Sequence, residues 1–132
     1  MHTLSLDNAR RMAAATHAAA QAGGMAVTIA VCDAAGRLVL LQRDDGALPI
    51  SVDLAPAKAR TAALVGVPSG ALEKAINSGQ SALTAMPGCV CLGGGLPVRH
   101  GGVLLGGIAV SGAPSGEQDE ALARHGLQAL SA

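Results

Sequence analysis

The chain has 132 residues, half of them hydrophobic and 14% charged, and its nine basic and nine acidic side chains balance to a net charge of zero. The length predicts a single domain over residues 1–132, and the balanced charge offers no basic face for nucleic acid. Phe, Tyr and Trp are all absent, which excludes base stacking and cation–π cages as binding modes.

The apolar composition predicts that the protein associates with itself. Mean hydropathy is +0.42, yet the longest apolar run, residues 103–110, is far shorter than the ~20 residues of a membrane helix. A small monomer cannot expose that much apolar surface without aggregating. We therefore expect a homo-oligomer with no membrane partner. Residues 1–5 lack the basic and then apolar pattern of a signal peptide, so we expect a cytoplasmic protein.

The first third of the chain predicts a helix followed by a β-hairpin. Ser5 is a typical N-cap for a helix over residues 6–22, and Gly23 and Gly24 suit its C-terminal end. His17 lies on the alanine-rich face of this helix, where a partner subunit or a flat ligand can approach closely. Residues 26–32 alternate in the manner of a strand, and residues 37–43 form its partner across a turn.

The middle of the chain predicts two more helices, a loop and a strand. With Asp53 as N-cap, Pro56 falls in the first turn of a helix that ends near Val65, where its missing amide hydrogen has no helical partner. Ser69 is expected to cap a short helix over residues 70–76. A loop over residues 77–88 and a strand over residues 89–92 follow.

The last third predicts a second hairpin and a closing helix. Residues 98–100 and 103–110 are the expected strands, and the pair Gly106 and Gly107 suggests a bulge or the close approach of a ligand or another backbone. Ser115 and Gln118 form a capping box, so the last helix begins near Gly116. Because hairpins impose antiparallel pairing, we expect an α+β domain with a five-stranded antiparallel sheet and helices packed against it.

Five short runs along the chain form a recognisable set of motifs. They are residues 53–55 (DLA), 58–62 (KARTA), 94–98 (GGLPV), 106–112 (GGIAVSG) and 118–120 (QDE). Together these runs resemble the GlcG/HbpS family over nearly the whole chain. The family includes haem-binding proteins and a domain at the C-terminus of some corrinoid adenosyltransferases. The resemblance implies the same α+β architecture and the binding of haem or another tetrapyrrole as a cofactor.

Four histidines are candidate haem ligands or acid–base groups. His2 belongs to the chain end, His100 to a hairpin tip and His125 to the surface of the last helix, so we expect these three to be solvated. Only His17 lies on a face of small residues. Two interpretations of His17 remain open, an axial haem ligand, as the resemblance implies for a histidine of the first helix, or a packing residue at an interface.

The basic side chains allow a pocket for an anionic small molecule. Two or three of them together would bind a carboxylate, such as a haem propionate or a small organic acid. The alternative is that each is solvated or paired with Asp33, Asp53 or Asp119. The candidate cations are Arg43, Lys58, Arg60 and Arg99.

Glycines of the second half of the chain are further candidates for this pocket. They either serve turns and tight packing or leave room for a ligand and offer it backbone amides. Neither phosphate-loop motif is present. The residues that we assign to ligand binding in this region are Gly94, Gly95, Gly106, Gly107 and Ser111.

The three cysteines, Cys32, Cys89 and Cys91, do not predict a metal site. A Cys-x-Cys pair lacks the Cys-x-x-Cys geometry of zinc sites, and free cysteine is among the most buried residue types. We expect all three to be buried apolar side chains in strands, with no bound metal.

Two functions therefore remain open. The first is an oligomeric protein that binds haem or a similar small ligand. The alternative is a cofactor-independent enzyme, an isomerase, deaminase or hydrolase, acting on a small anionic metabolite. Lys58 or Glu117 would then be the acid–base group and Arg43, Arg60 or Arg99 the carboxylate anchors. The sequence contains no Gly-x-Ser-x-Gly nucleophile elbow.

Overall fold

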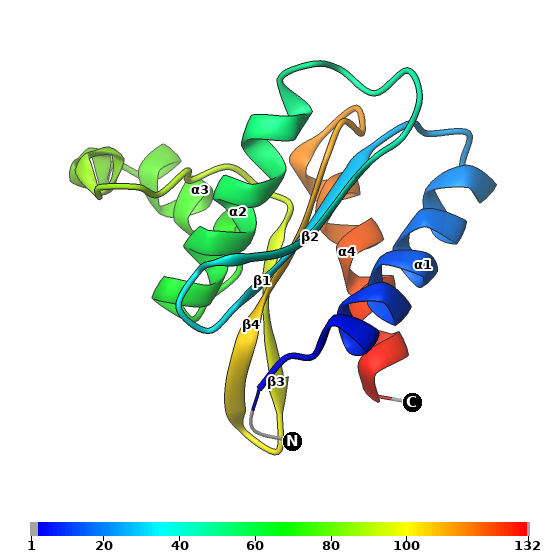
Figure 1. Ribbon diagram of the computed structural model, residues 1–132. Helices are drawn as coiled ribbons and strands as arrows, with labels where there is room; N and C mark the ends of the chain where they lie inside the picture. The colour runs from blue at the N-terminus through cyan, green and yellow to red at the C-terminus, as the bar shows by residue number, and fades with distance from the viewer. Residues whose placement is uncertain (1–2, 132) are drawn as a thin grey trace.

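The computed structural model describes residues 3–131, so His2 lies outside the described residues (Figure 1). Helices cover both faces of one sheet, and among the described residues no helix is long and apolar enough to cross a membrane. The elements in chain order are α1 (Leu6–Ala22), β1 (Thr28–Asp33), β2 (Leu38–Arg43), α2 (Ser51–Val65), α3 (Ser69–Asn77), the 3₁₀ helix η1 (Ser81–Ala85), β3 (Gly95–His100), β4 (Val103–Ser111) and α4 (Gly116–Ser131).

The sheet has four antiparallel strands in the order β2-β1-β4-β3. The expected α+β class is confirmed, but the fifth strand, over residues 89–92, is wrong. Backbone amides in and just after this segment bond to side chains and not to a neighbouring strand. The Val90 amide donates to Thr61 Oγ1 at 2.8 Å, and the Gly93 amide donates to Glu73 Oε1 at 2.8 Å. The segment is therefore held against α2 and α3 and leaves β3 as an edge strand.

The two faces of the sheet have cores of different size. Helices α1 and α4 lie together on one face, and α2 and α3 cover the other (Figure 1). The predicted alternation of β1 is confirmed, because Ile29 and Val31 belong to the larger core with α1 and α4, whereas Ala30 and Cys32 pack with the alanines of α2. The small residues on the second face allow α2 to lie very close to the sheet.

Two glycines make this close approach possible. A Cβ at Gly107 would overlap the carbonyl oxygen of Ala59, and one at Gly95 would overlap that of Lys58. The expectation that another backbone comes close to residues 106–107 is thus confirmed. The irregular register of β3 and β4 lies instead between Val98 and Arg99.

Helix starts follow the predicted chemistry in part. Ser5 Oγ accepts a hydrogen bond from the Asn8 amide at 3.1 Å, and Ser115 Oγ accepts one from the Gln118 amide at 3.2 Å, as expected. The start of α2 was predicted wrongly, since it begins at Ser51 after Ile50 and places Asp53 inside the first turn. The helix extends upstream to Ser51, whose amide already donates to the Leu48 carbonyl at 2.9 Å.

Candidate functional site

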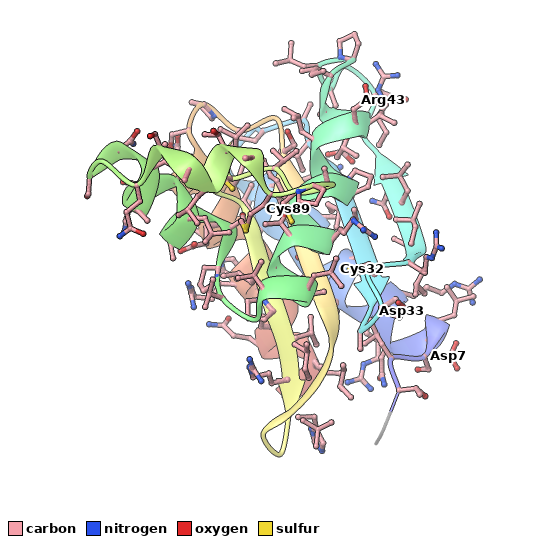
Figure 2. All side chains as sticks on the ribbon, turned by 90° about the vertical axis from the view of Figure 1, so that its left-hand side faces the viewer. Asp7, Cys32, Asp33, Arg43 and Cys89 are labelled. Carbon is pink, nitrogen blue, oxygen red and sulfur yellow. The ribbon has the colours of Figure 1, made fainter. Side chains whose placement is uncertain are left out.

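An open depression of about 750 Å³ lies where α1 ends beside the end of β2. His17 and Gln21 line it from α1, residues 24–26 from the following turn, and residues 42–45 from the end of β2. The structure thus brings His17 and Arg43, two of the predicted ligand-binding residues, to one depression. Figure 2 shows Arg43 beside the end of the sheet.

A carboxylate lies beside the His17 ring. Nδ1 of His17 lies 2.9 Å from Oδ1 of Asp44, and the two side chains are 32% and 11% exposed. Asp44 is itself fixed, because its Oδ2 accepts a hydrogen bond from the Val27 amide at 3.0 Å and its own amide donates to the Val27 carbonyl at 3.0 Å. With Nδ1 on the carboxylate, Nε2 on the other side of the ring is the nitrogen left to bind a ligand.

Arg43 adds a positive charge to the same depression. Its Nη2 donates to the carbonyl oxygen of Ala47 at 3.0 Å, which ties the side chain to the loop before α2.

Asp44, which lies beside His17, was not predicted as a site residue, because the sequence analysis interpreted it only as part of a turn. Its position directly after Arg43, at the end of a predicted strand, was the available signal.

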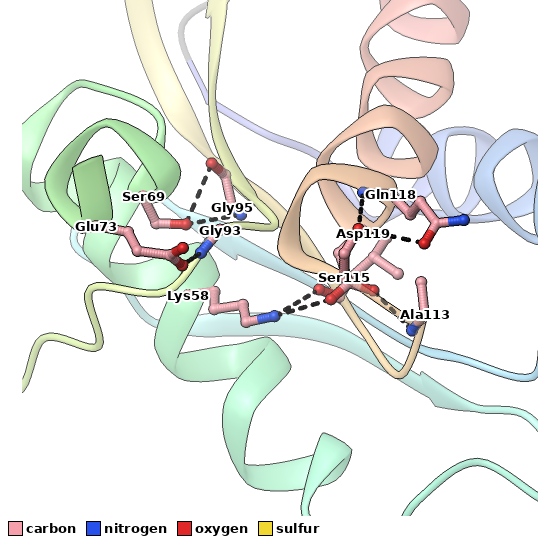
Figure 3. Close-up of polar contacts among 10 residues, drawn as sticks. Lys58, Ser69, Glu73, Gly93, Gly95, Ala113, Ser115, Gln118 and Asp119 are labelled. Atoms are coloured by element: carbon pink, nitrogen blue, oxygen red, sulfur yellow. Dashed lines mark hydrogen bonds and ion pairs between the residues drawn. The ribbon is translucent and has the colours of Figure 1, made fainter. Parts of the chain in front are cut away.

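A second polar cluster is buried between α2 and α4 (Figure 3). Lys58 Nζ lies 3.2 Å from Asp119 Oδ2 and donates to the Val110 carbonyl at 3.2 Å. The two side chains are 4% and 6% exposed. Burial raises the pKa of the Asp119 carboxyl, while the Lys58 ammonium and the Ala113 amide, which donates to Oδ1 at 2.9 Å, oppose the rise. One of the ion pairs considered from the sequence is therefore present.

The glycines before β3 adjoin this pair. Gly94 has φ +132°, and a Cβ there would lie 3.0 Å from both Lys58 Nζ and Asp119 Cβ. The Gly95 amide donates to Ser69 Oγ at 2.8 Å. These two glycines therefore lie next to Lys58, and protein atoms occupy the space that a side chain at either position would need. Ser111, at the end of β4, lines the same cavity as Lys58.

The remaining candidate residues lie elsewhere. Arg60 Nε donates to the Gly88 carbonyl at 3.3 Å and Arg99 Nη2 to the Gly66 carbonyl at 3.1 Å, so each supports a loop. A Cβ at Gly106 would overlap the Cys32 carbonyl, so Gly106 allows close packing between two strands. Gly107 does the same between β4 and α2. Glu117 lines a separate hollow between α3 and α4. The four cations do not converge on one pocket.

The cysteines differ in environment. Cys32 is fully buried, as predicted, and burial raises the pKa of its thiol to about 11. Cys89 and Cys91 are only partly buried, which corrects the prediction, because their segment is not a strand. Burial and the neighbouring Cys89 raise the pKa of the Cys91 thiol. Within residues 3–131 no three His, Cys, Asp or Glu side chains are grouped to hold a metal ion.

These features define a small α+β protein with an oriented histidine beside an open depression. A family model described as haem-degrading protein HbpS-like matches residues 4–128, and the chain belongs to this HbpS-like family. Protein GlcG of Escherichia coli K12 is 37% identical over 108 residues, which cover 82% of this chain and 81% of GlcG.

Two solved structures show how far the fold is shared. A double mutant of HbpS from Streptomyces reticuli superposes with a TM-score of 0.91 at 39% identity, covering 97% of this chain and 87% of HbpS. A complex of PduOC with haem superposes with a TM-score of 0.87 at 29% identity, covering 96% of this chain and 94% of PduOC. The fold of this chain is thus shared with a protein solved in complex with haem.

Proposed function

We propose that this protein binds haem in the depression beside His17, with Nε2 of His17 as an axial ligand. The observation that carries the proposal is the 2.9 Å contact between His17 Nδ1 and Asp44 Oδ1. Metal-binding histidines regularly give their second nitrogen to a carboxylate, which fixes the tautomer and makes the binding nitrogen more basic. The sequence can supply no aromatic wall, so aliphatic side chains such as Met25 and glycine backbone would contact the porphyrin.

The size of the depression supports the same ligand. Its volume of about 750 Å³ lies within the range of small-molecule and cofactor sites. Arg43 would pair with a propionate, since guanidinium and carboxylate form strong charge-assisted hydrogen bonds. Two carboxylates, Asp44 and Asp45, also line the depression, and Asp44 is already contacted by His17 at 2.9 Å and by the Val27 amide at 3.0 Å.

We further propose that the protein is a homo-oligomer. Strand β2 is an edge strand, and Leu38 and Leu41 on it are exposed, as are Leu64 and Val65 at the end of α2. An unpaired edge with exposed leucines is a site where a further chain can pack. Light scattering at micromolar concentration should give a discrete multiple of 12.9 kDa. A mass equal to one chain would refute the oligomer.

Titration with haemin tests the haem proposal. The wild-type protein should give a saturable Soret shift at one site per chain, and His17→Ala should abolish it. His125→Ala is the matched control, because His125 is exposed on α4 and should leave the titration unchanged. A spectrum indistinguishable from free haemin, or equal binding by His17→Ala and the wild type, would overturn the proposal.

A further inference from the structure

Lys58 faces a cavity that is separate from the depression at His17. The cavity has a volume of about 240 Å³ and shares no lining residue with the depression. Lys58, Ser111 and Asp119 form its polar part, and Glu73 contributes a further carboxylate. Three exposed apolar side chains also line it, with exposed fractions of 60% for Leu48, 54% for Ile50 and 43% for Leu92.

The charges in this cavity favour a neutral ligand over an anion. The Lys58 ammonium is already balanced by Asp119 at 3.2 Å, and Glu73 adds a negative charge to the wall. An ammonium group has three N–H donors, and the two described contacts, to Asp119 and Val110, account for two of them. A carbonyl oxygen suits the third, and the leucines at the wall suit an alkyl group.

The Lys58–Asp119 pair also has the two groups that imine formation needs, an amine and a carboxylate that can accept its proton. A lysine forms an imine through its neutral amine, so its ammonium must first give up a proton. The Lys58 side chain is 4% exposed and lies within hydrogen-bond distance of a carboxylate that can accept its proton. Burial raises the pKa of this carboxylate, so it is a better proton acceptor than an exposed aspartate.

We propose that this cavity is a second ligand site, in which the Lys58 amine forms an imine with a small apolar aldehyde. Lys58 first transfers a proton to Asp119. The amine lone pair then attacks the carbonyl carbon, and the carbonyl oxygen takes up a proton through Asp119 to give the carbinolamine. Asp119 then carries a proton from the nitrogen to this hydroxyl, which leaves as water, and a protonated C=N bond remains on Lys58. The net change joins ammonium and aldehyde to give iminium and water, with no oxidant or reductant.

Reductive trapping on the unmodified protein tests this site directly. The chain has only two lysines, Lys58 and Lys74, and Lys74 is exposed on α3. Butanal with cyanoborohydride reduces any imine to a stable butyl amine, which peptide mapping by mass spectrometry locates. Although Lys58 is buried, its initial labelling rate should exceed that of Lys74 by about tenfold, which corresponds to about 1.4 kcal/mol. Equal labelling, or labelling of Lys74 and the N-terminal amine alone, would overturn the proposal.

Two further comparisons separate imine formation from simple access to the cavity. Asp119→Asn should slow labelling of Lys58 and leave labelling of Lys74 unchanged, because only Lys58 uses this carboxylate. Glyoxylate, an anionic aldehyde, should label Lys58 more slowly than butanal, because Glu73 and Asp119 repel it. Unchanged Lys58 labelling in Asp119→Asn, or faster labelling by glyoxylate, would refute the assigned chemistry. The haemin titration of His17 is independent of all these results.

Discussion

Replacing Asp44 by asparagine tests whether the carboxylate makes His17 a ligand. Asp44 Oδ2 now accepts from the Val27 amide at 3.0 Å, and its Oδ1 lies 2.9 Å from Nδ1 of the His17 ring. An asparagine has one oxygen and one NH₂ group, so only one of these two nitrogens can keep an oxygen beside it. If its oxygen faces Val27, its NH₂ group faces Nδ1 and moves the ring proton to Nε2, where it blocks the metal.

The expected size of the effect follows from this arrangement. Loss of a partner that orients a ligating histidine lowers metal affinity about 10- to 100-fold, or about 1.4 to 2.8 kcal/mol. If the oxygen turns to His17 instead, the buried Val27 amide loses its acceptor, which costs about 1–3 kcal/mol of folding free energy. Asp44→Asn must therefore weaken either haem binding or the fold.

Haemin titration and urea denaturation of the same preparation measure both quantities. Asp45→Asn is the matched control, because Asp45 lines the depression with the same charge. Equal weakening by the two variants would show that only the overall charge matters. If Asp44→Asn changed neither affinity nor stability, the assigned role of Asp44 would be wrong.

Three predictions concern the fold. Lys58→Met should lower the free energy of unfolding in urea by about 3–5 kcal/mol, because it leaves Asp119 buried without its partner, and Lys58→Met/Asp119→Asn should restore part of the loss. Burial raises the pKa of the Cys32 thiol from 9.0 to about 11, so stability that is fully present below pH 9 should fall by about 3 kcal/mol as the pH rises through 11. Cys32→Ala should remove this slope in denaturation curves, and an unchanged slope would contradict the prediction. Gly107→Ala should lower the melting temperature in calorimetry, since its Cβ overlaps the Ala59 carbonyl, at a cost of about 1–3 kcal/mol.

Local signals in the sequence predicted most elements of the fold. Ser5 and Ser115 cap their helices as expected because a serine hydroxyl needs only an amide three residues away. The alternation in β1 and the glycine turn between β3 and β4 are equally local. Residues 89–92 have a good strand pattern but do not form a strand. The amides of Val90 and of Gly93, just after the segment, donate to side chains 29 and 20 residues away. No pattern within four residues can reveal such competition.

The candidate site was predictable only in pieces for the same reason. His17 was singled out by its helical face, and Lys58 by its place in a family motif. What the sequence does not show is the partner of each, because Asp44 lies 27 positions from His17 and Asp119 lies 61 positions from Lys58. Two or three of the four cations were expected to share a pocket because of their charge and their places on the second helix and at strand ends, and the fold uses two of them, Arg60 and Arg99, to bind loop carbonyls.

The order of the strands also determines when this protein can acquire its fold during synthesis. Strand β1 pairs with β4, so Thr28 meets Ser111 only after most of the chain has been translated. Helix α1 in turn packs beside α4, the last element. A nascent chain can form the β1–β2 hairpin early, because its contacts are local, but the long-range pairing of β1 with β4 at the centre of the sheet closes later. The ribosome must therefore release the chain through α4 before α1 is seated and His17 is held in its final position.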